Sequence, residues 1–211
     1  MKSRFGKLLI LALLVAAGIV FSPHMKPQVE QALFAREAHQ VKPVAPPPGI
    51  TYLAKVEDLV FEMTNQVRVA RGLAPLTRDA ELNNAARSFS NDMLARNFFD
   101  HDTPGGPTFE KRLAHQYPHW VHDMGENIWS GSGYDPGKTQ EIARDIVSDW
   151  LKSPGHRENM LDPSFTHLGV GVSARHHTIR ATQEFVGRFK IWPLNIEPPS
   201  FPFPGKVTCA S

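Results

Sequence analysis

The sequence predicts an α+β protein in which helices pack in layers against an antiparallel sheet. Two observations favour this fold class. Apolar residues recur at three- and four-residue spacing in three segments, which is typical of one buried helix face. Shorter runs rich in β-branched and aromatic residues lie between glycines and turns, which is typical of strands. Helices come first along the chain, then a strand, another helix and a closing hairpin, an order that suits layered α+β proteins.

The three helices are predicted from their apolar stripes. The first stripe runs from Val56 to Ala70, and Gly72 and Pro75 end it. The second stripe runs from Leu82 to Met93, with polar residues between its apolar members. The third runs from Ile142 to Leu151 and stops at Ser153-Pro154-Gly155, because proline and glycine interrupt helices.

Three strands are predicted in the second half of the chain. Residues 126–133 form a short run that contains an aromatic residue and ends in glycine. Residues 167–175 and 179–189 are rich in β-branched residues and are separated by His176-His177-Thr178, which indicates a tight turn. The last two strands are therefore expected to form a hairpin.

The N-terminus indicates export. Lys2, Arg4 and Lys7 precede an apolar run from Leu8 to Phe21, as in a secretory signal. A comfortable membrane span needs about 20 apolar residues, so this run is short for one. Residues 1–22 are interpreted as a signal peptide or an uncleaved signal anchor, which would tether the protein to a membrane. The protein is expected to be secreted, periplasmic or associated with the cell envelope.

The remaining chain divides by composition. Residues 23–53 are predicted to be a proline-rich linker, residues 54–190 the folded domain, and residues 191–211 a proline-rich C-terminal tail. The formal net charge is only +2 and no dense Lys/Arg tract is present, which argues against nucleic acid as a partner. Cys209 is the only cysteine, so no intramolecular disulfide is possible and an unimportant tail thiol is expected.

Three polar residues lie at the ends of predicted elements, where a scaffold can direct side chains into one cleft. His101 follows the second helix, Glu126 begins the first strand, and His156 lies just after the third helix. Two imidazoles and a carboxylate can bind a divalent cation such as Zn²⁺, or the carboxylate can orient one imidazole as a general base. Ten histidines are scattered along the chain, however, and spacing alone does not bring these residues together.

The other candidate patterns point to structure. His115, His119 and His122 have helix-like spacing, but Pro118 interrupts it, so a solvated loop is expected. No GxSxG elbow and no HExxH motif occur, so neither a serine hydrolase nor a compact zinc motif is indicated.

Three stretches in this order, "FFDHDTPGG", "GENIWSG" and "WLKSPGHRENMLDPSFTHLGVGV", resemble the bacterial branch of the CAP superfamily, and "ATQEF" in the last strand also fits. This superfamily, also called SCP, includes cysteine-rich secretory proteins, antigen 5 and pathogenesis-related proteins. The resemblance covers about Val56 to Phe189. It implies an α-β-α sandwich with a small antiparallel sheet between helical layers, and a shared cleft lined by His101, Glu126 and His156.

The same resemblance suggests which residues support the cleft. Arg157 and Asn159 are expected to hydrogen-bond nearby backbone or the Glu126 carboxylate. His167 is expected either to enter the cleft or, more simply, to cap the following strand. Gly155 is expected to adopt a backbone conformation closed to other residues, which would place His156 at a helix start.

The chain departs from the family pattern at one ligand position. Eukaryotic relatives commonly have a second glutamate where this chain has Ser153, and they use disulfides that are absent here. A divalent cation on His101 and His156 therefore stays a hypothesis. The resemblance favours a binding protein for a lipid, a cation or an envelope component. The alternatives are a metal-dependent or general-base hydrolase of peptides or cell-envelope material, with His101, Glu126 and His156 as catalytic candidates, and a structural envelope protein.

Overall fold

The computed structural model describes residues 41–119, 121–188 and 205–210. The predicted signal segment and most of the predicted linker and tail lie outside these residues. Contacts divide the chain after Lys42, and the fold described below belongs to the unit that begins at Pro43. Within the described part of the chain, none of the helices has the length and hydrophobicity that a membrane span requires.

The described residues form five helices and six strands. The helices are α3 (Ala54–Val69), α4 (Ala80–Ala95), α5 (Phe109–Gln116), α6 (Thr139–Lys152) and α7 (Pro154–Leu161). The strands are β1 (Thr51–Tyr52), β2 (Thr77–Arg78), β3 (Val121–Ser132), β4 (His167–Arg175), β5 (Thr178–Arg188) and β6 (Val207–Ala210). The three predicted helices and the closing hairpin are confirmed.

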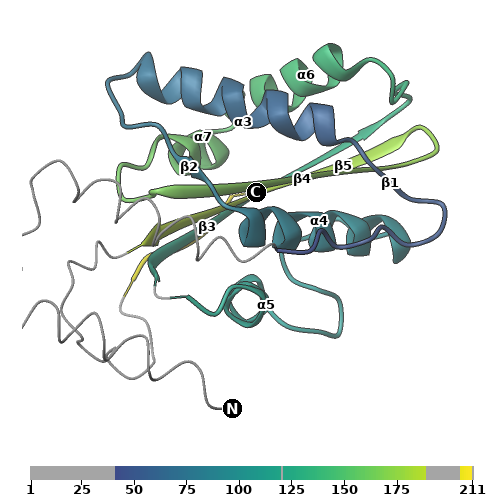
Figure 1. Cartoon of the computed structure of the whole chain (residues 1–211), viewed down its shortest axis with the longest axis horizontal. Helices are drawn as coiled ribbons and strands as arrows, with labels where there is room; N and C mark the ends of the chain where they lie inside the picture. The colour runs from purple at the N-terminus through teal and green to yellow at the C-terminus, as the bar shows by residue number, and fades with distance from the viewer. Residues whose placement is uncertain (1–40, 120, 189–204, 211) are drawn as a thin grey trace, which may run out of the picture. The chain divides into compact units, whose positions relative to one another are not determined.

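The strands make one sheet with the order β1-β4-β5-β3-β6, and β2 pairs with β4. The β4-β5 and β5-β3 pairs are antiparallel, as predicted, and the β1-β4 pair, which was not predicted, is antiparallel too. The β2-β4 and β3-β6 pairs are parallel, so the sheet is mixed rather than purely antiparallel. Helices α3, α6 and α7 cover one face of the sheet, and α4 and α5 cover the other (Figure 1). The predicted α+β fold with an α-β-α sandwich is confirmed.

Each helical layer packs on its own apolar cluster. Trp150 of α6 is buried with apolar residues of α3, β4 and β5, and its indole Nε1 donates to the carbonyl of Ile128 at 3.0 Å. On the opposite face, α4 approaches β4 closely at two glycines. A Cβ at Gly169 or Gly171 would lie 2.2 Å from backbone atoms of α4. Only glycine permits this approach, so these residues fix the helix against the strand.

Two segments outside the predicted domain also enter the sheet. β1 lies in the residues interpreted as linker, and Thr51 pairs with Ala174 of β4. β6 lies in the residues interpreted as tail, and it pairs in parallel with β3, Met124 opposite Val207 and Asn127 opposite Ala210. The sheet therefore extends beyond the boundaries that composition suggested.

The predicted solvated loop around His115, His119 and His122 is wrong for two of these residues, because only His119 lies in the connection between α5 and β3. His115 lies in the last turn of α5, and His122 lies in β3. Pro118 follows the end of α5 at Gln116, so the proline borders the helix instead of interrupting it.

Candidate functional site

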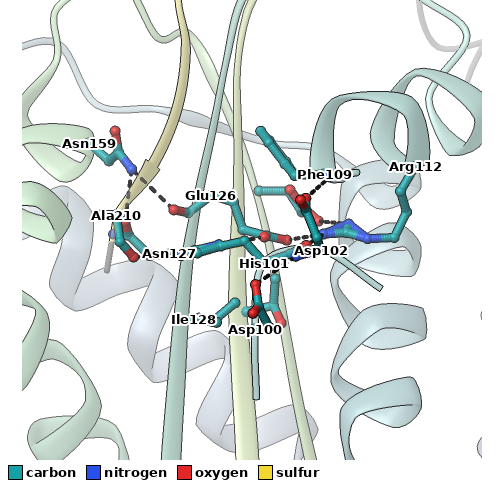
Figure 2. Close-up of polar contacts among 12 residues, drawn as sticks. Asp100, His101, Asp102, Phe109, Arg112, Glu126, Asn127, Ile128, Asn159 and Ala210 are labelled. Atoms are coloured by element: carbon teal, nitrogen blue, oxygen red, sulfur yellow. Dashed lines mark hydrogen bonds and ion pairs between the residues drawn. The ribbon is translucent and has the colours of Figure 1, made fainter. Parts of the chain in front are cut away.

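His101 lies in the loop between α4 and α5, and two side-chain contacts fix this loop. The Asp102 carboxylate accepts the backbone N–H of Phe109 at 2.9 Å, at the start of α5. The Asp100 carboxylate accepts the backbone N–H of Asp102 at 3.1 Å. The imidazole between these residues is thereby directed toward β3 (Figure 2).

Glu126 lies fully buried in β3 and has a partner on each carboxylate oxygen. Oε1 lies 2.8 Å from Nδ1 of His101, and Oε2 accepts from Nη2 of Arg112 at 2.6 Å. Arg112 reaches the carboxylate from α5 (Figure 2). Its guanidinium also lies 3.4 Å from the ring centroid of Phe89, a cation–π contact that holds it in place.

A second buried carboxylate stands beside the first. Glu184 of β5 is paired directly opposite Glu126 of β3 and has no solvent exposure. Its nearest cationic atom is Nη1 of Arg112 at 3.5 Å, and neither carboxylate oxygen has a hydrogen-bond partner among the described residues. One guanidinium therefore faces two carboxylates.

Burial shifts the pKa values of both carboxyl groups upward. It raises the pKa of Glu126 to about 7, although Arg112 opposes the change. Burial, followed by the charge of Glu126, raises the pKa of Glu184 well above its usual range. Glu184 therefore keeps its proton to a higher pH than an exposed glutamate does, and a protonated Glu184 reduces the repulsion between the two groups.

The imidazoles shift in the opposite direction. Burial lowers the pKa of His101, and the carbonyl of Ala210 opposes this change. Burial also lowers the pKa of His156, and the neighbouring His101 adds to that shift. Both rings consequently favour the neutral form near neutral pH.

His156 lies in the first turn of α7, as predicted, but its environment is unusual. Both ring nitrogens are inaccessible to solvent and make no hydrogen bond of ordinary geometry among the described residues, although the carbonyl of Ala210 lies near enough to influence the pKa of the ring. The predicted special backbone at Gly155 is wrong, because Gly155 is helical and its φ is not positive. Glycine is instead needed for space, since a Cβ there would lie 3.2 Å from Cβ of Ala210.

An amide network holds α7 against β3. Asn159 Nδ2 donates to the backbone carbonyl of Glu126 at 3.1 Å and to Oδ1 of Asn127 at 3.0 Å (Figure 2). Asn127 Nδ2 in turn donates to the carbonyl of His156 at 3.1 Å and to Gln183 at 3.1 Å. These bonds place His156 beside the strand that carries Glu126.

The remaining predicted supporting residues have structural contacts. Asn159 contacts the backbone of Glu126 and not its carboxylate. Arg157 donates to the carbonyl of Leu151 at 2.9 Å and so joins α7 to the end of α6. His167 begins β4, and its Nδ1 lies 2.8 Å from the hydroxyl oxygen of Thr166. Burial lowers the pKa of His167, and the charge of Arg188 adds to that shift.

β6 completes the site. The Nε2 atom of His101 lies 2.6 Å from the carbonyl oxygen of Ala210, which belongs to β6. Cys209 precedes Ala210 on the same strand, and its free thiol is exposed. We call the set His101, Arg112, Glu126, His156 and Glu184 the His–Glu site.

The His–Glu site does not fit a resident metal ion. Across residues 41–119, 121–188 and 205–210, no three His, Cys, Asp or Glu side chains converge as a ligand set. Both nitrogens of His101 already face oxygen atoms, those of Glu126 and Ala210. Of the two imidazoles in the site, only His156 then has ring nitrogens available as metal ligands. A single imidazole does not hold a divalent cation tightly.

Reasoning from sequence missed Arg112, Glu184 and Ala210. Glu184 carried a detectable signal, because it lies in the stretch "ATQEF" that contributes to the family resemblance. Arg112 carried none, because the apolar pattern of its short helix is limited to Phe109 and Leu113. Ala210 has no chemistry of its own and matters only through its backbone carbonyl.

Known proteins resemble this chain over the domain that carries the site. The family model described as the cysteine-rich secretory protein family, CAP, matches residues 61–185. The YkwD protein of Bacillus subtilis (strain 168) is 37% identical over 133 residues, which cover 63% of this chain and 47% of YkwD. The membrane protein YlbC of the same organism is 33% identical over 133 residues, which cover 63% of this chain and 35% of YlbC. The chain spans less than half the length of the curated relatives it matches.

Solved structures share the fold. An extracellular protein with an SCP domain from Bacillus anthracis str. Ames has 31% identity and a TM-score of 0.52, over 63% of this chain and 40% of that chain. An outer surface protein from Borrelia burgdorferi has 19% identity and a TM-score of 0.53, over 64% of this chain and 94% of that chain. At the latter identity the likeness extends to the fold alone.

Proposed function

This chain belongs to the cysteine-rich secretory protein (CAP) family, and on that premise we propose that it acts by binding a ligand outside the cytoplasm through the His–Glu site. The ligand presents a carbonyl oxygen that takes the place of the Ala210 carbonyl at Nε2 of His101. The observation that carries this proposal is the 2.6 Å contact between His101 Nε2 and a backbone carbonyl. Glu126 lies on the Nδ1 side of the ring, and when its carboxyl group is protonated it donates to Nδ1, so that Nε2–H is a preformed donor.

The unpartnered nitrogens of His156 support the same proposal. Buried polar atoms without partners are rare in folded proteins, and each one calls for an explanation. His156 lies beside His101 and near the same carbonyl, since both groups influence its pKa. A bound ligand with further polar atoms would supply the missing hydrogen bonds.

The proposed location rests on two independent features. The first is the basic and apolar N-terminal segment, in which Lys2, Arg4 and Lys7 precede the run to Phe21. The second is the similarity to the extracellular protein of Bacillus anthracis. N-terminal sequencing of the protein recovered from outside the cytoplasm tests this, because protein confined to the cytoplasm would exclude export.

Native mass spectrometry of the full chain incubated with cell-envelope extract tests ligand binding. We expect an added mass on the wild-type protein that disappears in His101→Ala. The matched control is His115→Ala, because His115 is an exposed histidine in α5. An added mass that survives His101→Ala would show that the ligand binds elsewhere, and its absence from every sample would count against the proposal.

A general-base hydrolase is the second candidate, and the shifted pKa values of Glu126 and His101 favour it. One imidazole would then activate water, and the carboxylate would orient the ring. Turnover of a peptide or peptidoglycan library should vanish in Glu126→Gln and persist in Glu141→Gln, an exposed carboxylate of α6. Equal turnover in Glu126→Gln and the wild type would remove this candidate.

A further inference from the structure

β6 occupies the edge of β3 in the manner of a bound peptide. Its residues align in parallel with β3 from Met124–Val207 to Asn127–Ala210, and β6 is the outermost strand of the sheet. Peptides that add a strand to a sheet edge obtain affinity from the backbone and specificity from alternate side chains. The contacts of residues 206–210 follow this pattern.

The first contact position takes a basic side chain. Nζ of Lys206 lies 2.9 Å from a carboxylate oxygen of Glu158 and 3.3 Å from one of Asp162, both on or just after α7. The backbone N–H of Lys206 donates to Oδ1 of Asp123 at 2.8 Å. Three acidic residues thus surround the entry of the strand.

The next two contact positions take small side chains. The hydroxyl of Thr208 donates to Oδ1 of Asn159 at 2.6 Å. Ala210 is 5% exposed and packs where Gly155 leaves room, and its carbonyl accepts from His101. Val207 and Cys209, which alternate with these residues, are exposed. Every second side chain of this segment therefore contacts the rest of the domain, as expected from the alternation of side chains along a strand.

We propose that the edge of β3 and helix α7 form a binding site for extended peptide segments, and that β6 is its intramolecular occupant. The preferred segment has a basic residue, a small hydroxyl residue two positions later and a small apolar residue two positions after that. This inference rests on the proposed function, because His101 is the donor for the segment's last carbonyl.

An external segment must displace β6 to bind. A strand in the same chain competes at an effective concentration far above that of a free peptide, so the wild-type protein binds external peptides weakly. Displacement is accessible because β6 has only four residues and buries only the side chain of Ala210 deeply. Such elements open with less free energy than the global unfolding requires.

Fluorescence anisotropy with a labelled peptide tests the inference. The probe has the sequence of residues 205–211 with serine in place of Cys209, and an amidated end. The variant Ala210→Arg in the full chain places a long side chain against Gly155 and should release β6. Its matched control is Val207→Arg, which adds the same charge at a position of the same strand that is 42% exposed. We expect the probe to bind Ala210→Arg at least tenfold more tightly than the wild type or Val207→Arg.

The specificity of the probe supplies the second arm. Replacing its lysine with glutamate should weaken binding to Ala210→Arg at least tenfold, because the lysine faces Glu158 and Asp162. Equal affinity of the probe for Ala210→Arg and the wild type would overturn the inference, and so would equal affinity of the two peptides.

Hydrogen exchange of the wild-type protein keeps the inference testable if Ala210→Arg does not fold. The amides of residues 207–210 should exchange at least a hundredfold faster than those in the middle of β5. Exchange of both strands at one common rate would mean that β6 opens only with the whole domain, which would overturn the inference.

The two proposals can fail separately. If the variant Ala210→Arg does not bind the peptide but still shows the added mass from envelope extract, and this mass depends on His101, the peptide inference is wrong and the proposed binding function stands. If neither the peptide nor any envelope component binds, both are wrong.

Discussion

The Nδ1 atom of His101 lies 2.8 Å from Oε1 of Glu126, and this pair must hold one proton when β6 is in place. The other ring nitrogen faces the carbonyl oxygen of Ala210, which can only accept. Because a neutral imidazole has one donor, either the ring is cationic or the Glu126 carboxyl carries the proton and donates to Nδ1. Burial raises the pKa of Glu126 to about 7 and lowers that of His101, which favours the second arrangement.

The contact of β6 is therefore predicted to weaken as the pH rises above about 7. Once Glu126 is ionised, Nδ1–H donates to it, and the lone pair of Nε2 faces the Ala210 carbonyl. The other charged groups around the ring are Arg112, Glu184 and Asp100, and His156 adds a second imidazole. Protection of the amides of residues 207–210 should fall by up to about tenfold per pH unit, after correction for intrinsic exchange.

Hydrogen exchange at pH 6, 7 and 8.5 measures this effect, with the amides in the middle of β5 as an internal control. The variant Glu126→Gln keeps a side chain that can donate to Nδ1 at every pH. Its β6 protection should not change with pH in this range. A pH-dependent loss of equal size in Glu126→Gln and the wild type would contradict the shared proton.

Sequence patterns located most of the fold because they are local. The stripe from Val56 to Ala70 has enough apolar residues to define a helix face, and the structure places α3 at Ala54–Val69. The β-branched run that begins at His167 matches β4 at both ends. Helix α5 escaped prediction because eight residues with two apolar anchors give little periodicity. β6 escaped because its pairing with β3 is entirely long-range.

The site was less accessible to such reasoning than the fold. No spacing rule joins His101 to Glu126, which lie 25 residues apart on a loop and a strand. Only the resemblance to CAP proteins brought them together before the structure did. Glu184 enters the site through its cross-strand position opposite Glu126, and that register belongs to the long-range pairing of β3 with β5 and not to any local motif.

Removing the guanidinium of Arg112, which faces both Glu126 and Glu184, is predicted to destabilise the domain strongly at high pH. Arg112→Met keeps a long apolar side chain over Phe89 but leaves Glu126 without its guanidinium partner. Breaking a buried ion pair costs about 3–5 kcal/mol, and the loss should shrink near pH 5, where the carboxyl groups are protonated. Urea denaturation at pH 5 and 8 measures the difference. Lys152→Met, at an exposed pair with Asp149, should stay within about 0.5 kcal/mol, and an equally small effect of Arg112→Met would refute the prediction.

Glu184→Gln is predicted to stabilise the protein as the pH rises. The folded-state pKa of Glu184 is raised above its unfolded value of 4.5, so the native state binds the extra proton. The contribution of Glu184 to the free energy of unfolding is fully present below pH 4.5. It is lost as the pH rises toward the folded-state pKa, at about 1.4 kcal/mol per pH unit. Glutamine has no such titration. The free energy of unfolding of Glu184→Gln should thus match the wild type at pH 4 and exceed it at pH 8. Glu141→Gln is the exposed control, and a constant difference at all pH values would contradict the assignment.

Gly171→Ala is predicted to separate α4 from the sheet. The added Cβ would lie 2.2 Å from the backbone nitrogen of Arg87, and backbone atoms within a helix cannot move aside individually. Overpacking of this kind costs about 1–3 kcal/mol and sometimes more, because the whole helix must shift. Gly137→Ala is the matched control, since its Cβ would meet only the Asp135 side chain at 3.3 Å. Thermal unfolding should show a large fall in Tm for Gly171→Ala and almost none for Gly137→Ala. Equal Tm values for the two variants would mean that α4 tolerates displacement, and the glycines of β4 would then not fix the layer that carries Phe89 beneath Arg112.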